Sequence, residues 1–346
     1  MRAAVLRGPE VLRVEQLPDP PVPKGGMLVK VYACGICGSD LRSYRFGLKV
    51  DLPWQVPGHE VAGEVIAVGE DVTGWQVGDR VALAADVTCG ECAYCRRGYP
   101  NLCEKHRVLG VHLQGGMAEV LKLDEEILHH GIVHRIPDGL DYDAAAMAEP
   151  ASSVMAAQED VGVAAGETVV VIGAGPMGTL HAELAMAKGA QVFLLDLAED
   201  RLEAAREIVP EARMIHTASE DPMEVVRAAT GGLGADVAIS AAPTAAAVNQ
   251  AIDIVCKCGR VVVFGGLPKD RSGVTINANR LHYDEILVRG AFSYRPKHHA
   301  QALDYIACGR IKAHKYITHR LPLDRVEEGF KLLAAGKAMK VIIKPN

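Results

Sequence analysis

"ETVVVIGAGPMGTLHAELAMAKGAQVFLLDLAEDRL" (residues 167–202) is the stretch that decides the fold. Its apolar run at 169–172 predicts a buried parallel strand. Gly173, Gly175 and Gly178 follow with the spacing G-x-G-x-x-G and open an alanine-rich helix. The first glycine of such a pattern allows a tight turn, the second lets a pyrophosphate approach, and the third lets helix and strand pack closely. The stretch therefore predicts a dinucleotide-binding βαβ unit.

The second half of this stretch indicates which dinucleotide is bound. The strand at 191–196 ends in Asp196, at about the distance from the glycines where a carboxylate bonds the adenosine ribose. A carboxylate there repels the extra phosphate of NADP, so NAD is favoured. Arg201 lies one helical turn further and could cover the adenine or the ribose. Pro176 and Met177 stand in the first turn of the helix, whose N–H groups can bind phosphate. The alternative to ribose binding is that Asp196 is an acidic surface residue without a ligand.

The βα alternation continues beyond this unit. Apolar runs separated by helical stretches predict a doubly wound parallel sheet. Gly265 and Gly266 close one of these strands where a cofactor should pass. We expect the backbone groups of Ala291, Phe292 and Ser293 to face the nicotinamide amide. The further runs are 235–242, 258–267 and 285–294.

Four cysteines in fifteen positions form a separate motif, with the spacing C-x2-C-x2-C-x7-C. Such short gaps bring several thiolates to one point, as a tetrahedral zinc ion requires. An iron–sulfur cluster is the rival, because it also takes four cysteines. Four thiolates fill the coordination sphere of zinc and leave no place for a substrate, so the expected site is structural. The residues are Cys89, Cys92, Cys95 and Cys103.

A second candidate metal set mixes sulfur, nitrogen and oxygen ligands. Cys37 lies in "CGICGSD" (34–40), His59 and Glu60 lie in "PGHEVAGEV" (57–65), and Glu149 lies in "AEPASS" (148–153). A mixed set of this kind is typical of a catalytic zinc that keeps one position for water or substrate. Either Glu60 or Glu149 can be the permanent carboxylate ligand, and Glu60 is favoured because it adjoins His59.

Residues beside Cys37 favour it over Cys34 as the metal ligand. Cys34 lies in a strand-like stretch and is expected to be a buried neighbour. Ser39 offers a hydroxyl that can relay a proton. Asp40 offers a carboxylate that can orient His59 from behind. We therefore expect Ser39 to be catalytic and Asp40 to support the metal ligands.

Composition sets the broad class. The 346 residues suffice for two domains, with 23% charged and 49% hydrophobic residues. The net charge of −6 gives no reason to expect nucleic acid or an anionic membrane surface as a partner. No apolar run approaches the roughly 20 residues that span a bilayer. We expect a cytoplasmic protein whose nine cysteines are not a disulfide framework.

The pattern of elements divides the chain into three stretches. Residues 1–153 carry short strands, glycine-rich turns and both metal sets. The βα alternation occupies residues 154–289. Residues 290–346 mix helices with a final strand, "KVIIKP" (340–345), and are expected to return to the first domain.

In order and spacing, these motifs together resemble the zinc-dependent medium-chain alcohol dehydrogenases, nearest to the polyol (sorbitol/L-iditol) and threonine dehydrogenase branches. The resemblance covers the whole length. It implies an α/β fold with a GroES-like, mostly β catalytic domain and a Rossmann domain. It also implies two zinc ions per chain, a small-molecule alcohol substrate and a homotetramer or homodimer. Cys37, His59 and Glu60 or Glu149 are assigned to the catalytic zinc, and the four-cysteine motif to the structural one.

The implied reaction is NAD-dependent oxidation of a secondary alcohol, such as a polyol, to the ketone. Threonine is the nearest rival substrate. A zinc-free quinone reductase shares this fold but has no need for Cys37, His59 and Glu149. A non-catalytic NAD-binding redox sensor would not need those residues either, so their presence argues against both alternatives. Arg42 stands where relatives often carry a histidine that passes on the proton, which leaves cofactor ribose and water for that step.

Overall fold

The computed structural model describes residues 1–346 and divides the chain into two compact units. Unit 1 comprises Met1–Ser152 and Arg295–Asn346, and unit 2 comprises Ser153–Tyr294. The chain thus re-enters unit 1 at Arg295, later than the expected residue 290. The segment after the last strand of unit 2 stays on its sheet, since the Ala291 N–H donates to the Val263 carbonyl at 3.1 Å.

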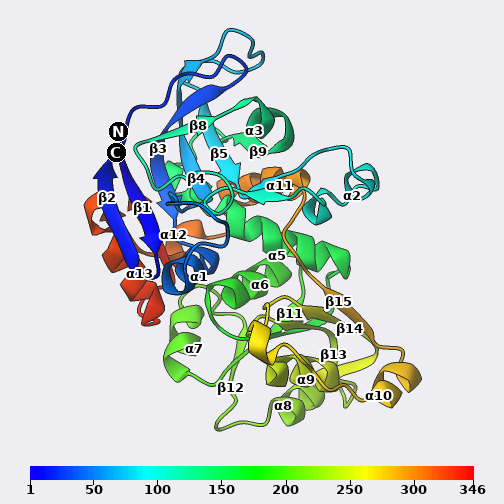
Figure 1. The fold of residues 1–346 in the computed structure, drawn as a ribbon. Helices are drawn as coiled ribbons and strands as arrows, with labels where there is room; N and C mark the ends of the chain where they lie inside the picture. The colour runs from blue at the N-terminus through cyan, green and yellow to red at the C-terminus, as the bar shows by residue number, and fades with distance from the viewer. The chain divides into compact units, whose positions relative to one another are not determined.

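Unit 1 is built on a seven-stranded, mostly antiparallel sheet (Figure 1). Its path is β16-β17-β3-β4-β5-β9, with β8 pairing β3, and two smaller pairs accompany it. The strands of the main sheet are β3 (Met27–Gly35), β4 (Glu60–Val68), β5 (Arg80–Ala84), β8 (Val120–Leu123), β9 (Ile132–Arg135), β16 (Ile317–Pro322) and β17 (Lys340–Lys344). The pairs are β1 (Arg2–Gly8) with β2 (Val11–Gln16), and β6 (Asp86–Val87) with β7 (Arg107–Val108).

Short helices accompany this sheet, and the two chain ends meet within the unit (Figure 1). The Arg2 N–H donates to the Glu119 carboxylate at 2.7 Å, and the Asn346 amide donates to the Glu119 carbonyl at 2.8 Å. The helices are α1 (Gly38–Phe46), α2 (Ala93–Arg96), α3 (Glu125–His130), α4 (Tyr142–Ala146), α11 (Pro296–Ala307), α12 (Ala313–Tyr316) and α13 (Val326–Ala334), and α5 (Ala148–Asp160) runs from unit 1 into unit 2.

Unit 2 confirms the predicted doubly wound sheet. Six parallel strands follow the order β12-β11-β10-β13-β14-β15. All five residues of β10 are buried, as expected for a central parallel strand. The strands are β10 (Thr168–Ile172), β11 (Gln191–Asp196), β12 (Arg213–His216), β13 (Ala235–Ser240), β14 (Val255–Val263) and β15 (Leu287–Gly290).

The strand order reverses between β10 and β13, which lie side by side although two strands separate them in the sequence. In open α/β sheets, ligands bind outside the carboxyl ends of the strands at such a reversal. The fold therefore places the glycine motif, which follows β10, at the edge where a dinucleotide belongs. The helices of the unit are α6 (Pro176–Ala187), α7 (Glu199–Arg206), α8 (Pro222–Ala229), α9 (Ala245–Ile254) and α10 (Ala278–Tyr283).

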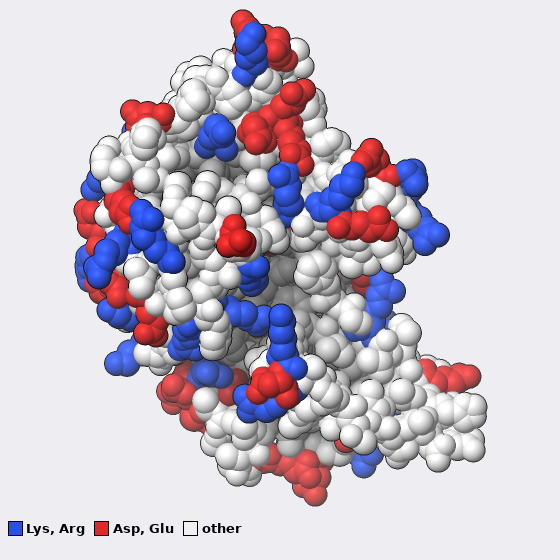
Figure 2. Space-filling view, viewed as in Figure 1, with Lys and Arg blue, Asp and Glu red and all other residues white.

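Acidic and basic side chains are interspersed over the face drawn in Figure 2. None of the helices is long and apolar enough to cross a membrane.

Candidate metal centres and dinucleotide site

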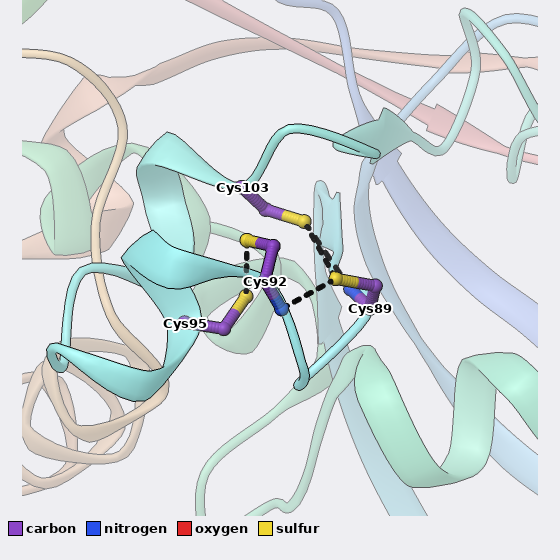
Figure 3. A group of neighbouring side chains, drawn as sticks. All are labelled: Cys89, Cys92, Cys95 and Cys103. Carbon is purple, nitrogen blue, oxygen red and sulfur yellow. Dashed lines mark hydrogen bonds between the residues drawn. The ribbon is translucent and has the colours of Figure 1, made fainter.

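A compact loop between β6 and β7 gathers the four cysteines of residues 89–103 (Figure 3). Gly90 and Gly98 have φ values of +70° and +81°, which favour glycine, and both lie at tight turns of this loop. Helix α2 and a 3-10 turn at Pro100–Leu102 are the regular elements of this loop.

The sulfur atoms are spaced as a tetrahedral metal site requires. Each cysteine's Sγ lies within 4.8 Å of the other three. The Sγ atoms of Cys92 and Cys95 are 3.5 Å apart, and those of Cys103 and Cys89 are 3.4 Å apart (Figure 3). Four thiolates at about 2.3 Å from zinc stand roughly 3.8 Å from one another. The donor set therefore fits a zinc ion closed to substrate.

Backbone donors around this cluster favour thiolate. The N–H of Cys92 lies 3.3 Å from the Cys89 sulfur, and the N–H of Lys105 lies 3.3 Å from the Cys103 sulfur. Backbone N–H donors, that of Cys95 foremost, lower the pKa of the Cys92 thiol to about 6. Burial, with the neighbouring thiol of Cys92, raises the pKa of Cys95 to about 12. A divalent cation would displace the proton that this arrangement leaves on Cys95.

The second set lies at the junction of β3, α1 and β4. Cys37 is the N-cap of α1, and its Sγ lies within 4.8 Å of a His59 nitrogen and a Glu60 oxygen. His59 precedes β4 and Glu60 begins it, with Gly58 at φ +97° just before. This left-handed turn lets the adjacent His59 and Glu60 point to one place, which a regular strand would forbid.

Asp40 and Ser39 flank His59. The Asp40 carboxylate accepts the Cys37 N–H at 2.9 Å and the Gly58 N–H at 3.2 Å, and lies 3.6 Å from His59 Nδ1. Burial opposes ionisation of Asp40, but His59 and these N–H donors outweigh it and lower its pKa. Ser39 Oγ lies 3.5 Å from His59 Nε2. Asp40 thus lies on the Nδ1 side of the His59 ring. The other ring nitrogen, Nε2, faces Ser39.

Glu60 has a buried partner that was not predicted from the sequence. Lys340, on β17, donates its Nζ to both Glu60 carboxylate oxygens, at 2.6 and 2.7 Å. Both residues are buried. The sequence does contain one indication of this pair: Lys340 is the first residue of an apolar strand, and a buried charge there needs a partner. Its partner could not be read from the sequence, because 280 positions separate the two residues.

The remaining candidates of this set are placed as follows. Glu149 is the second residue of α5, is buried, and acts electrostatically on Lys340. Cys34 is also buried, but its sulfur packs against Gly58 and does not belong to the group of Cys37. Burial raises the pKa of the Cys34 thiol well above its usual value, as expected of a structural thiol.

The glycine motif has the geometry of a phosphate-binding turn. Gly173 has φ +108°, and a side chain on Gly178 would overlap the Gly173 carbonyl, so helix and turn meet only through glycine. A Cβ on Gly175 would meet no atom within 4 Å. The space in front of Gly175 and the first turn of α6, which begins at Pro176 and Met177, therefore fits a pyrophosphate.

Asp196 is bound to this turn. Its two oxygens accept the Ala174 N–H at 2.8 Å and the Ala198 N–H at 2.9 Å. Arg201 places a guanidinium nitrogen 3.9 Å from the same carboxylate. A fixed carboxylate at the end of β11 has the position of a ribose ligand, and the arginine beside it is itself exposed.

The other predicted cofactor residues follow the neighbouring strands at the same sheet edge. The Gly265 N–H donates to the Ser240 carbonyl at 2.9 Å, and Gly266 is open on its Cα side. Ala291, Phe292 and Ser293 follow β15, with Phe292 59% exposed and Ser293 at φ +54°. The turn after β13 was not predicted: there the N–H groups of Ala241 and Ala242 both donate to the Ile172 carbonyl at 2.9 Å.

Comparison with known proteins identifies the family. Residues 23–138 match the family model "Alcohol dehydrogenase GroES-like domain", and residues 176–307 match "Zinc-binding dehydrogenase". A sorbitol dehydrogenase from Halalkalibacterium halodurans is 32% identical over 96% of this chain and 95% of its own length. The chain belongs to the zinc-dependent alcohol dehydrogenases. It is an oxidoreductase of the polyol branch, and the predicted fold class is confirmed.

Two further relatives mark the range within this alcohol dehydrogenase family. An L-threonine 3-dehydrogenase from Bacillus licheniformis is 32% identical over 96% of this chain and 94% of its own. A zinc-binding dehydrogenase from Sinorhizobium meliloti 1021, solved with NADP, superposes with a TM-score of 0.91 at 30% identity and 99% coverage of both chains. The family thus supports zinc and a nicotinamide dinucleotide, NAD or NADP, as the cofactors.

Proposed function

We propose that this dehydrogenase oxidises a secondary alcohol of a polyol to the ketone, with NAD as acceptor and two zinc ions per chain. The observation that carries the proposal is the group of Cys37, His59 and Glu60 within 4.8 Å, with Ser39 beside it. When bound, zinc acts as a Lewis acid on the alcohol and the nicotinamide accepts the hydride.

In this proposal the chain holds the catalytic zinc through Cys37, His59 and one carboxylate, Glu60 or Glu149. The Asp40 carboxylate lies 3.6 Å from His59 Nδ1 and places negative charge on that side of the ring, and Nε2 would face the metal. Ser39, whose Oγ lies 3.5 Å from Nε2 of His59, would relay the proton of the substrate hydroxyl: as it accepts that proton, it passes its own hydroxyl proton on to cofactor ribose and water. The four cysteines of residues 89–103 hold the structural zinc.

NAD is proposed over NADP because Asp196 occupies the ribose position. Its carboxylate is fixed by two backbone N–H groups and would face the extra phosphate of NADP. The turn at Gly173 and Gly175 and the first turn of α6 bind the pyrophosphate, and Gly178 lets that turn and the helix pack closely. Gly265, Gly266 and residues 291–293 contact the nicotinamide half.

We also propose a cytoplasmic homo-oligomer. A four-thiol metal site requires reduced thiols, which the cytoplasm maintains. Leu287 on the edge strand β15 is 50% exposed, and Phe292 just after this strand and Tyr283 at the end of α10 are 59% and 73% exposed. Apolar side chains on a sheet edge are typical of surfaces that a second copy covers. Light scattering of the purified chain measures the assembly.

The proposed function is tested by NAD reduction against a panel of polyols, with L-threonine as the rival substrate. At least one polyol should be oxidised more efficiently than L-threonine. Ser39→Ala should lower kcat on that polyol by roughly 10²- to 10⁴-fold, because it removes the hydroxyl that relays the proton. Ser39→Thr keeps the hydroxyl and serves as the matched control. Full turnover of Ser39→Ala, or oxidation of L-threonine alone, would contradict the proposal.

A further inference from the structure

Two histidines join helix α11 to the edge of the unit 1 sheet. His134 lies on β9, the last strand of the sheet path, and His299 is the fourth residue of α11. His299 begins a buried stripe of this helix that continues through Ala302, Leu303 and Ile306 at helical spacing. His299 is fully buried, whereas His134 is half-buried. A titratable ring thus occupies a position where an apolar side chain would be expected.

The two rings share one hydrogen bond. Their Nδ1 atoms are 2.9 Å apart, their planes are inclined by 25° and their centroids are 5.1 Å apart. The nitrogens are much closer than the centroids, so the rings meet at their Nδ1 edges. One Nδ1 must therefore carry the hydrogen and the other must accept it. The Nε2 atom of His299 is buried and has no hydrogen-bond partner.

This buried Nε2 atom indicates which ring donates, because a neutral imidazole carries a single N–H. If His299 donates through Nδ1, its Nε2 is a bare acceptor. If His299 accepts at Nδ1, its Nε2 carries an N–H that no group receives. Buried N–H groups without an acceptor are rarer than acceptors without a donor. We therefore assign the donor to His299 and the acceptor to His134.

The pair has no favourable place for an additional proton. A proton on Nε2 of His299 keeps the shared hydrogen bond, but it creates a buried N–H without an acceptor. A proton on Nδ1 of His134 turns two N–H groups toward each other and abolishes the hydrogen bond. Burial lowers the pKa of His134, and burial, with the neighbouring His134, lowers the pKa of His299 to about 3.

No carboxylate is available to balance a charge on this pair. Helix α11 contacts β9 and α4, and β9 contacts β5 and α3. The titratable groups of these elements are exposed or have other partners, and none of them acts electrostatically on either ring. These groups are Arg135 on β9, Arg80 on β5, Tyr142 and Asp143 on α4, Lys297, His298, Asp304 and Tyr305 on α11, and Glu125, Glu126, His129 and His130 on α3.

We propose that His134 and His299 form an acid-sensitive contact, which holds the first turns of α11 on β9 while both rings are neutral and releases them when the rings are protonated. Helix α11 begins at Pro296, directly after the chain re-enters unit 1 at Arg295. The contact therefore governs the attachment of the segment through which the chain returns to this unit. It depends on neither metal site and on no substrate.

The direction of the pH effect follows from the lowered pKa of both rings. Rings that are released to solvent have the ordinary pKa of about 6.5 and take up protons that the closed pair does not. The contact is therefore complete above about pH 6.5 and weakens as the pH falls below that value. Between pH 7 and pH 5.5, the equilibrium constant for opening should rise roughly eightfold for one such histidine and up to roughly 70-fold for two.

The test is amide hydrogen exchange of the full-length protein at pH 7 and pH 5.5, with rates corrected for the intrinsic pH dependence of exchange. In the wild type, the protection of α11 should fall by up to roughly 70-fold between these two values. His299→Asn supplies an amide that can donate to His134 but cannot be protonated, so the fall should shrink to roughly eightfold or less. With His134→Asn added, the fall should disappear. His282→Asn, which replaces an exposed histidine of unit 2, is the matched control and should behave like the wild type.

Constant protection of α11 in the wild type overturns the proposal, as does an equal fall in His299→Asn and the wild type. Where His299→Asn does not fold, NMR of the imidazole rings in the wild type decides. The rings of His134 and His299 should stay neutral while α11 is protected and should titrate only as it opens. Titration of either ring near pH 6.5 with α11 still protected would overturn the proposal.

Discussion

A single carboxylate, Asp196, is hydrogen-bonded to the glycine turn and lies where we propose that the cofactor ribose binds. It accepts the N–H of Ala174, inside the turn, and of Ala198, just before α7. Its charge thus stays at the end of β11, where a ribose hydroxyl would bond it and an added phosphate would be repelled. The same contacts mean that its loss also loosens the turn.

Asp196→Ala should therefore lower kcat/KM with NAD and narrow the preference over NADP. A hydrogen bond to a charged group contributes about 1.5–3 kcal/mol, so the expected loss with NAD is roughly tenfold to a hundredfold. Steady-state kinetics with both cofactors measure it. Asp200→Ala, an exposed neighbour on α7, is the control and should change little. An unchanged preference in Asp196→Ala would remove this residue from cofactor selection.

Residue roles were predictable where chemistry and spacing are local. Cys37, Ser39 and Asp40 lie within one turn, and their relation to His59 follows once the chain returns through Gly58. The Glu60–Lys340 pair was not predictable, since it depends on which strand lies beside β3. A sequence shows that a carboxylate adjoins a histidine, but not that an ammonium 280 residues away is bound to it.

At the scale of elements, the loop of residues 89–103 has little hydrophobic core of its own. Among its residues only Cys103 is buried, and Tyr94, Tyr99 and Leu102 are each at least 40% exposed. A loop this poor in apolar burial needs another source of order, and a four-thiolate metal can provide it.

Cys95→Ser should therefore release the structural zinc and loosen this loop. The metal contributes ~10 kcal/mol in isolated zinc peptides and less inside a larger fold. Thermal unfolding should start at a lower temperature, limited proteolysis should cut within the loop, and turnover should persist in the folded fraction. Cys308→Ser, an exposed thiol outside the cluster, is the matched control. An unchanged melting curve and cleavage pattern for Cys95→Ser would argue against a structural metal.

The elements of unit 2 were predictable because parallel strands are buried on both faces and appear as apolar runs. The predicted runs at 169–172, 191–196 and 235–242 correspond to the strands β10, β11 and β13, and β13 ends at Ser240. The boundary near residue 290 was less accurate, because the segment that follows β15 has no apolar period of its own. Its attachment to β14 is a backbone hydrogen bond, which any residue can form.

At the scale of the whole molecule, metal and dinucleotide chemistry belong to different compact units. Both candidate metal sets lie in unit 1, and the glycine motif with Asp196 lies in unit 2. A change at one site should therefore leave the fold of the other unit intact. We propose that unit 1 holds two zinc ions with separate roles.

Elemental analysis of the wild-type protein and of Cys37→Ser, combined with NAD binding and turnover, tests this claim most directly. We expect two zinc ions in the wild type and one in Cys37→Ser, with turnover abolished and NAD binding retained. A wild type with one zinc or with iron, or a Cys37→Ser variant that keeps two zinc ions and full activity, would contradict it.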